Sequence, residues 1–241
     1  MAPAVAIITA RAGSKRIPKK NIKPFAGAPI IKYSIEAALF SDCFQEVMVS
    51  TDDTGIAEIA VSYKAKVPFF RSKKTSDDCA TTADVINEVL LEYQKNGQYF
   101  EYCCCLYPTA PFTTSEKIIQ GFKLLKEKKA DSVIPVVRFS HPIQRALKIK
   151  NGKLKMIHPE YIHVRSQDLI TAYHDVGQFY WLKVKPFLKH KKLFMENTVP
   201  MEVSEMEVQD IDDENDWKQA ELKYKILKSR VSSERYSHEK I

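Results

Sequence analysis

Small and basic residues follow the first apolar run of the sequence. Residues 5–8 (VAII) indicate a buried strand, and residues 11–20 (RAGSKRIPKK) come directly after it. Small residues let the backbone approach a ligand with its N–H groups, and nearby cations neutralise what such loops most often hold, a phosphate. A solvated basic loop is the alternative interpretation. Because open α/β sheets bind ligands where a strand ends, the position of this loop favours a phosphate site.

Several common catalytic motifs are missing from the sequence. Gly13 has no second glycine five residues later, which excludes the Walker A pattern, and the GxGxxG pattern is also missing. Neither P-loop nor dinucleotide-binding chemistry is therefore supported. No catalytic triad or nucleophile elbow is evident either, so the sequence offers no nucleophile for a covalent intermediate.

Two carboxylates near the end of the chain form a second candidate site. Asp210 and Asp212 stand at i and i+2 in VQDIDDEND, and on an extended segment that spacing points both to one side. The pair suits a hard cation such as Mg²⁺, which takes a few carboxylates together with phosphate oxygens and water. The alternative is the acidic first turn of a helix, which Asp213, Glu214 and Asp216 fit well.

The basic composition has two interpretations, a nucleic-acid partner or an acidic small-molecule substrate. The net charge is +7, but the basic residues are scattered, and no helix-turn-helix, RNA-recognition or zinc-finger pattern appears, so we expect no nucleic-acid partner. No apolar run approaches the ~20 residues of a membrane span, and no secretion signal begins the sequence, so we expect a cytoplasmic protein without a membrane partner. The five cysteines are expected to be free thiols in a reducing compartment.

Strand-like and helix-like segments alternate along the chain, which predicts a three-layer α/β/α fold with a mostly parallel sheet. The expected helices cover residues 29–40, 56–63, 83–94, 115–128 and 214–227. After the first strand, the expected strands cover residues 46–50, 67–70, 102–106, 132–137 and 177–181.

The alternation stops after residue 137. Residues 147–157 predict a hairpin with Asn151-Gly152 as its two-residue turn, and a polar, irregular stretch continues to about residue 173. Such an excursion from a compact domain is either functional or an interaction arm. Residues 229–241 are polar and charged, and we expect them to form a flexible tail.

Three motifs in order resemble one enzyme family. The first is ARxGSKxIPxKNI after a strand, the second is HPIQRAL (residues 141–147), and the third is RSQDLxxAYHDxGQFYW (residues 165–181). Over residues 5–227 the chain resembles the CMP-sialic acid synthetase family, cytidylyltransferases that activate nine-carbon acidic (nonulosonic) sugars. The second and third motifs are most similar to the branch that acts on pseudaminic acid.

This resemblance implies one cytidylyltransferase domain, residues 1–228, with a Rossmann-like nucleotidyltransferase fold. Residues 138–176 would be an inserted arm that makes a homodimer and reaches over the partner's active site. The enzyme would transfer CMP from CTP to the anomeric hydroxyl of pseudaminic acid and release pyrophosphate with Mg²⁺. Legionaminic, N-acetylneuraminic and 3-deoxy-octulosonic acids are alternative acceptors. A protein of another class, which binds nucleotide or nucleic acid without catalysis, is the remaining alternative.

The resemblance also assigns residues to the nucleotide. Lys20 is expected at the α-phosphate, where charge accumulates during displacement, and Asp210 and Asp212 at the metal. Lys15, Arg16 and Lys19 are expected in supporting or solvent-exposed roles. The expected catalytic residues are Arg11, Lys20, Asp210 and Asp212. The expected nucleotide-binding residues are Arg11, Gly13, Ser14, Lys20, Asn21, Arg71, Thr81 and Thr82.

Two of these assignments have structural alternatives. Thr81 and Thr82 would either contribute to base recognition or cap the helix that follows them, and the residues alone leave both open. Asp52 and Asp53, which follow a strand, would either contact the ligand or cap the next helix.

The acceptor sugar is expected to meet residues that lie mostly on the arm. Arg165 would bind the sugar carboxylate with two parallel bonds from the partner subunit. Tyr107 stands where the sialic acid enzymes commonly have glutamine, which argues against N-acetylneuraminic acid. The expected sugar-binding residues are Tyr107, Gln144, Arg165 and His174.

Overall fold

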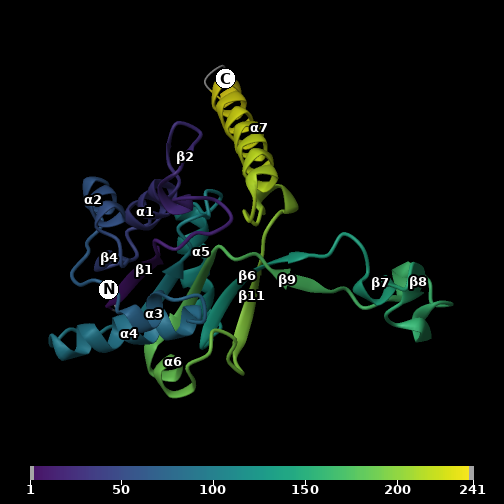
Figure 1. The fold of residues 1–241 in the computed structure, drawn as a ribbon, viewed down its shortest axis with the longest axis horizontal. Helices are drawn as coiled ribbons and strands as arrows, with labels where there is room; N and C mark the ends of the chain where they lie inside the picture. Colours follow the sequence, from purple (N-terminus) through teal and green to yellow (C-terminus); the bar gives the residue numbers. More distant parts are fainter. Residues whose placement is uncertain (1–2, 239–241) are drawn as a thin grey trace.

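A seven-stranded sheet forms the centre of the molecule in the computed structural model, which describes residues 3–238 and their side chains to residue 229 (Figure 1). The strand order is β11-β6-β10-β5-β1-β4, and β9 pairs with β6 beside this path. The strands are β1 (Ala4–Thr9), β4 (Glu46–Ser50), β5 (Tyr102–Leu106), β6 (Ser132–Arg138), β9 (Tyr173–Asp175), β10 (Phe179–Lys183) and β11 (Thr198–Glu202).

The sheet is mostly parallel, as the sequence predicts. Strands β4, β1, β5, β6 and β11 run in one direction, because β10 is antiparallel to both β5 and β6 and the remaining neighbours on the main path pair in parallel. Strand β9 is antiparallel to β6. The carboxyl ends of β1, β4 and β5 therefore meet at one edge, where a ligand site is expected in such sheets.

Helices cover both faces of the sheet, which confirms the three layers. Buried side chains of α1, α2 and α5 pack with one face, and those of α4 and α6 pack with the other. The helices are α1 (Ile31–Phe40), α2 (Thr54–Ser62), α3 (Lys73–Ser76), α4 (Thr82–Lys95), α5 (Ser115–Glu127), α6 (Val184–His190) and α7 (Glu214–His238). Short 3₁₀ turns are η1 (Lys20–Ile22), η2 (Ile143–Arg145), η3 (Pro159–Tyr161), η4 (Ser166–Asp168) and η5 (Glu205–Glu207).

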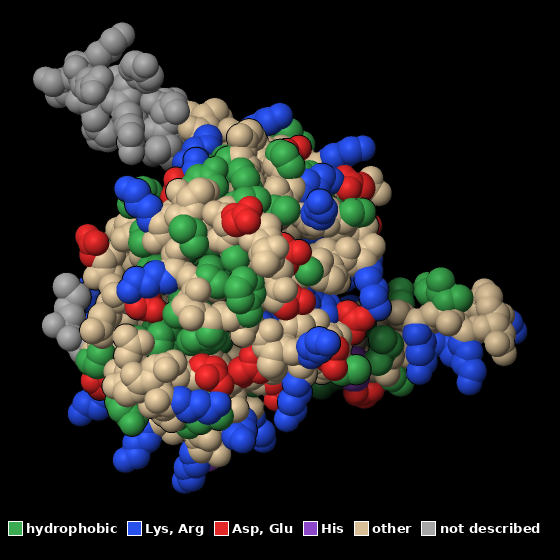
Figure 2. Space-filling model, turned by 60° about the vertical axis from the view of Figure 1, so that its left-hand side comes forward, with side chains coloured by type: hydrophobic (Ala, Val, Ile, Leu, Met, Phe, Trp, Pro, Cys, Tyr) green, Lys and Arg blue, Asp and Glu red, His purple; other side chains and the backbone are tan. Residues whose placement is uncertain are grey.

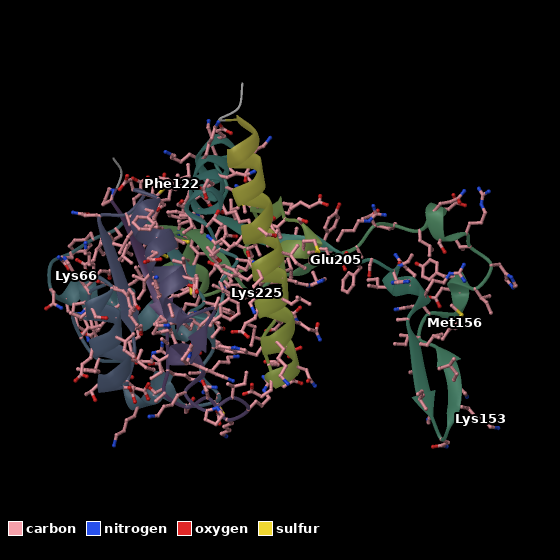
Figure 3. All side chains as sticks on the ribbon, turned by 90° about the horizontal axis from the view of Figure 1, so that it is seen from above. Lys66, Phe122, Lys153, Met156, Glu205 and Lys225 are labelled. Atoms are coloured by element: carbon pink, nitrogen blue, oxygen red, sulfur yellow. The ribbon has the colours of Figure 1, made fainter. Side chains whose placement is uncertain are left out.

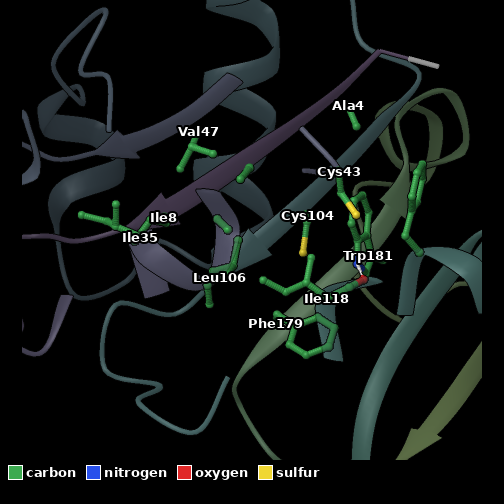
Figure 4. Close-up of a cluster of buried hydrophobic side chains, with 14 of the residues drawn as sticks. Ala4, Ile8, Ile35, Cys43, Val47, Cys104, Leu106, Ile118, Phe179 and Trp181 are labelled. Carbon is green, nitrogen blue, oxygen red and sulfur yellow. Dashed lines mark hydrogen bonds between the residues drawn. The ribbon is translucent and has the colours of Figure 1, made fainter. Parts of the chain in front are cut away.

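Trp181 is the largest side chain in the first of these two cores (Figure 4). Its indole N–H donates to the carbonyl of Ile118 (3.0 Å), and its ring stacks on Phe122 at 4.5 Å. Gly121 of α5 makes this packing possible, since a Cβ there would lie 2.9 Å from the indole. A larger residue at position 121 would therefore collide with the Trp181 side chain unless the helix moved away from the strand.

The consecutive cysteines of β5 follow the alternation of a strand. Cys104 packs in the core that contains α5, whereas Cys103 and Cys105 pack in the core that contains α4. All five cysteines are free thiols, as expected, and burial raises the pKa of Cys105 to about 12.

Several expected boundaries are wrong. Residues 67–70 form no strand: Lys66 makes one parallel bridge to Met48, and Pro68, which has no N–H to donate, follows. Helix α1 begins at Ile31, because residues 24–29 form a small hairpin, β2 (Pro24–Phe25) and β3 (Ala28–Pro29). Helix α7 continues to His238, past the expected end at residue 227, and residues 239–241 of the predicted tail lie outside the described residues.

An arm leaves the body between β6 and β9 and carries its own hairpin (Figures 1 and 3). Strands β7 (Leu147–Lys150) and β8 (Lys153–Met156) pair antiparallel, with Lys153 at the tip of this hairpin. Asn151 and Gly152 have φ of 53° and 70°, the left-handed pair that a two-residue turn requires. The predicted hairpin is confirmed.

Candidate functional site

A cavity of 620 Å³ opens at the carboxyl edge of the sheet. Thr9 at the end of β1 lies in its wall, and the basic loop, the segment before α4 and the residues after β5 complete it. Nine of the residues predicted for the site line this one cavity: Arg11, Gly13, Ser14, Lys20, Asn21, Arg71, Thr82, Tyr107 and Asp212.

A small apolar cluster brings the two predicted motifs together. Ile17 of the basic loop is buried (1% exposed) and packs with Phe25, Ile211 and Trp217. The cluster joins the loop to the start of α7, so that residues 191 positions apart in sequence become neighbours.

Lys20 occupies the point where the two motifs meet. Its ammonium donates to the carbonyl of Ile211 (2.5 Å), and Lys20 also begins the turn η1. Burial lowers the pKa of Lys20, and the carboxylates of Asp212 and Asp210 oppose that shift. A partly buried cation without a close ion pair is suited to an incoming anion, because the anion would restore its charge balance.

Hydrogen bonds to the backbone hold the loop in shape. The Asn21 amide donates to the carbonyl of Arg11 (2.8 Å), and the N–H of Ala12 donates to Asp52 (2.9 Å). Asp53 instead caps α2 by accepting from the N–H of Ile56 (2.8 Å). Of the two aspartates whose role the residues left open, one therefore supports the loop and the other caps a helix.

The other loop cations are paired with carboxylates that the sequence did not single out. Arg11 lies 2.8 Å from Asp78 and donates to the carbonyl of Asp77 (2.8 Å), and Lys15 also pairs with Asp78. Hydrogen bonds from Lys15 and Arg11 lower the pKa of Asp78. Asp77 and Asp78 line the cavity, yet no local pattern marks them, since their partners lie more than 60 positions away.

Arg71 is a buried cation of the cavity wall, 8% exposed. Its guanidinium donates to the hydroxyl (3.0 Å) and carbonyl (2.7 Å) of Ser50, at the end of β4. Burial lowers the pKa of Arg71, and Asp52 is the foremost opposing charge. The side chain is thus fixed in one position, as recognition of a flat polar group requires.

The two threonines before α4 have different roles. Thr81 is the N-cap of α4 in a capping box with Asp84, and it does not line the cavity. The Thr82 hydroxyl lies 2.9 Å from the Tyr107 hydroxyl, and both residues line the cavity. The geometry therefore supports the capping interpretation for Thr81 and a cavity position for Thr82.

The aspartates before and at the start of α7 also differ in their roles. Asp213 accepts from the N–H of Asp216 (3.0 Å) while Asp216 accepts from that of Asp213 (3.0 Å), so the two together cap the start of α7. Asp212 lines the cavity and pairs with Arg16 (2.6 Å). Asp210 is exposed, lies outside the cavity lining and makes no hydrogen bond or ion pair through its carboxylate in the described part of the chain.

The donor set of Asp210 and Asp212 fits a Mg²⁺ ion that shares its coordination with phosphate and water. Among the described residues no group of three or more His, Cys, Asp or Glu side chains could hold a metal by itself. Mg²⁺ in nucleotide enzymes commonly takes one or two carboxylates together with substrate phosphates. The two aspartates are suited to that arrangement.

Three residues predicted for the sugar lie on the arm and do not line the cavity. The Gln144 amide donates to the carbonyl of Ile170 (3.1 Å), Arg165 pairs with Asp168 (2.9 Å), and His174 lies against Phe139 at 4.7 Å. Each of the three contacts another residue of the arm, whereas Tyr107, the fourth residue predicted for the sugar, lines the cavity.

The residues that line the cavity suit a polyanion at the basic loop and a neutral polar group near Arg71, Thr82 and Tyr107. A nucleoside triphosphate has this division of charge, since its phosphates are anionic and its base is neutral.

No helix among the described residues is long and apolar enough to cross a membrane.

Comparisons with known proteins agree with that chemistry. A family model described as Cytidylyltransferase matches residues 5–235. The chain is 39% identical over 221 residues to a pseudaminic acid cytidylyltransferase of Campylobacter jejuni, covering 91% of this chain and 95% of the relative. It is 33% identical over 220 residues to a CMP-N,N'-diacetyllegionaminic acid synthase of Legionella pneumophila, covering 88% and 92%.

Solved structures share the fold. A CMP:2-keto-3-deoxy-manno-octonic acid synthetase in complex with CTP superimposes with a TM-score of 0.67 at 15% identity, covering 92% of this chain and 98% of that one. A 4-diphosphocytidyl-2C-methyl-D-erythritol synthase from Anaerococcus prevotii gives 0.65 at 14% identity, covering 93% and 99%. The predicted nucleotidyltransferase fold is confirmed.

Proposed function

The chain belongs to the cytidylyltransferase family, and from that premise we propose that it transfers CMP from CTP to the anomeric hydroxyl of pseudaminic acid. The cytidylyl transfer follows from the family. Relatives of 38–39% identity named pseudaminic acid cytidylyltransferase support the choice of sugar. Tyr107, in place of the glutamine common in sialic acid enzymes, is consistent with a sugar other than N-acetylneuraminic acid.

The position of Lys20 is the observation that carries this proposal. Its ammonium donates to the carbonyl of Ile211, and no carboxylate of the described residues lies within ion-pair distance of it, although Asp212 and Asp210 are near enough to oppose the lowering of its pKa. Charge accumulates on the α-phosphate oxygens as the anomeric oxygen bonds to the α-phosphorus and the bond to the β-phosphate oxygen breaks. Pyrophosphate leaves with that electron pair, and the hydroxyl proton goes to solvent. A preorganised cation at this point lowers the barrier.

The remaining loop groups would hold the triphosphate. Arg11 and Lys15 would exchange the carboxylate of Asp78 for the β- and γ-phosphates, and the Gly13 and Ser14 segment lines the same part of the cavity. Arg71 and Thr82 would contact the base.

We further propose that Asp210 and Asp212 hold the Mg²⁺. When bound, the ion would neutralise phosphate charge and help align the triphosphate. Asp210→Asn and Asp212→Asn should weaken binding of Mn²⁺, a spectroscopic substitute, in the presence of CTP. Asp213→Asn is the matched control, because it removes the same charge from the same segment while asparagine keeps the helix cap. Equal Mn²⁺ affinity in all three variants would contradict this metal assignment.

The position of the arm residues supports a homodimer, which we include in the proposal. Gln144, Arg165 and His174 lie outside the cavity of their own chain, so they can serve a cavity only if that cavity belongs to a partner. Free thiols and a CTP substrate support a cytoplasmic enzyme.

The test of the proposed function is pyrophosphate release from CTP and Mg²⁺ with four acids offered separately: pseudaminic, legionaminic, N-acetylneuraminic and 3-deoxy-octulosonic acid. Release with pseudaminic acid alone supports the proposal. Release with legionaminic acid alone would favour that sugar as the acceptor, a choice that the 33% identical relative supports. Binding of CTP without release in any mixture would favour the binding-protein alternative.

A further inference from the structure

Residues 72–80, the wall segment, form one side of the cavity between Arg71 and α4. Thr75, Asp77 and Ala80 of this segment line the cavity, and the same three residues line a second cavity of 470 Å³ against α4. The wall segment is thus a thin partition with open space on both sides. Little packed protein supports it from behind.

Apolar packing does not hold the wall segment in place. Its short helix α3 has the sequence KKTS, without an apolar side chain, and lies beside α4 (Figure 1). In the wall segment, all of which the structure describes, Thr75 alone is buried, and no residue belongs to a hydrophobic cluster. A helix of this length is also unstable by itself, so the segment depends on polar contacts.

Glu88 of α4 supplies such contacts. One of its carboxylate oxygens accepts from the backbone N–H of Ser72 (2.9 Å), and the other accepts from the hydroxyls of Ser72 (2.5 Å) and Thr75 (2.8 Å). Burial disfavours the charged form of Glu88, but these hydrogen bonds outweigh it and lower its pKa. An ionised carboxylate therefore ties α4 to both the first residue and the buried residue of the wall segment.

A second, more exposed tether holds the other end of the wall segment. Arg11 donates to the carbonyl of Asp77 (2.8 Å) and pairs with Asp78, which Lys15 also contacts. In the proposed function the triphosphate replaces Asp78 at these cations, so this tether weakens when CTP binds. The contacts of Glu88 lie outside the cavity lining and are unaffected by that exchange.

We propose that Glu88 is a positioning residue that holds the wall segment against α4 and so maintains the CTP cavity beside Arg71. The inference rests on the proposed function for the identity of the ligand. Glu88 does not line the cavity and acts through Ser72 and Thr75. Because Ser72 follows Arg71 directly, a displaced wall segment would open the cavity on the side where the base is proposed to bind.

Glu88→Ala removes the anchor. KM and Kd for CTP should rise about tenfold, because CTP would then have to order the wall segment as it binds. The value of kcat should change little, since Lys20 is untouched. Glu92→Ala is the matched control: it makes the same change one turn later on α4, where the carboxylate pairs with Lys95 of the same helix.

Glu88→Gln should restore most of the affinity. The amide oxygen can accept from the N–H of Ser72, and the amide N–H₂ can donate to either hydroxyl, since a hydroxyl oxygen also accepts. Thr75 can then give its proton to the Ser72 carbonyl, 3.4 Å away. We expect a loss of only about two- to threefold.

A double-mutant cycle separates positioning from general stabilisation. Ser72→Ala removes one hydroxyl that Glu88 accepts from, and it should weaken CTP binding in the wild-type background. In the Glu88→Ala background it should cause no further loss, because its partner is already missing. Additive losses that follow the melting temperature would contradict the positioning role.

The experiment combines calorimetric Kd for CTP without metal or sugar, steady-state kinetics, and hydrogen exchange of residues 72–80. The expected result for Glu88→Ala is weaker CTP binding, a higher KM with little change in kcat, and faster exchange, with Glu92→Ala near wild type. Unchanged CTP affinity in Glu88→Ala, or an equal loss in Glu92→Ala, would overturn the inference.

Failure of the proposed function has a different signature. If the wild-type enzyme binds CTP and turns over no sugar, the proposed transfer fails, while the Kd values still decide the role of Glu88. If it binds no CTP, hydrogen exchange decides, because it needs no ligand: faster exchange of residues 72–80 in Glu88→Ala supports the anchor, and unchanged exchange overturns it.

Discussion

The cavity and the arm of this molecule are stabilised in different ways. In the cavity, charged side chains from distant segments pair with one another, as Arg11 does with Asp78 and Arg16 with Asp212, and buried strands hold their loops. On the arm, the ion pair of Arg165 with Asp168 is local, and Ile149 and Ile170 are 78% and 80% exposed. The lining of the cavity described above comes from one chain, whereas the arm leaves apolar surface that the partner proposed above would cover.

The β7–β8 hairpin shows this difference most clearly. Its register places Leu147 opposite Met156 and Ile149 opposite Leu154 on one face, and two directly opposed lysine pairs on the other: Lys148 with Lys155 and Lys150 with Lys153. Like charges directly opposite each other destabilise a sheet, and an isolated hairpin is marginal in water. Figure 2 shows the arm projecting from the body with its lysines in solvent.

The largest effect is expected from the cavity. Lys20→Ala should lower kcat by about 10²- to 10³-fold, because it removes the cation proposed for the α-phosphate. Steady-state kinetics test this, with Lys19→Gln, an exposed neighbour, as the control. The melting temperature should not fall, since burial already disfavours the charged form of Lys20. Wild-type kcat in the alanine variant would contradict the assignment.

For the arm, we expect substitutions to affect dimerisation. Replacing Ile149 with serine should weaken the dimer about a hundredfold, because a symmetric dimer loses this side chain from both protomers and each contributes roughly 1.5 kcal/mol when covered. Sedimentation velocity measures the change, and activity should fall with the dimer fraction. Replacing Lys148 with serine alters the other face and should leave the dimer intact. A dimer that survives Ile149→Ser would show that this face is not the interface.

A smaller effect, a gain in CTP affinity, is expected when an ion pair inside the cavity is removed. Asp78→Asn removes the carboxylate that Arg11 and Lys15 contact, so CTP should bind a few times more tightly, as the low energy of exposed ion pairs suggests. Calorimetry without acceptor sugar measures it. Weaker binding in this variant would mean that Asp78 contributes to the CTP site directly.

The smallest effect is a pH dependence. Burial lowers the pKa of Lys20 from its usual 10.5, so the ammonium is lost as pH rises through a value below that of a solvent lysine. CTP affinity should therefore decline in the same range. Asp212→Asn removes the strongest opposing charge and should move the decline to lower pH, measured without metal. Superimposable profiles of wild type and variant would exclude Lys20 as the titrating group.

Local patterns predicted most of the fold. The limits of β4 and β5 agree with the predicted segments, and the Asn-Gly turn set the hairpin register, because the causes of these features lie within a few residues. The strand predicted at residues 67–70 failed, because β pairing requires a neighbour and Pro68 cannot donate. The insertion of antiparallel β10 between β5 and β6 was equally invisible, since strand order is a long-range property.

By itself, the sequence determined where the side chains suited to phosphate and to a metal stand along the chain, in the basic loop after β1 and in the aspartates before α7, and their roles there are predictions. Only the tertiary structure decided how they meet, through the packing of Ile17 with Ile211 and Trp217, and which cations are already paired, through Asp78. Motifs record side-chain chemistry, which is local. A contact such as that of Lys20 with Ile211, 191 positions apart, arises from packing, which no single segment encodes.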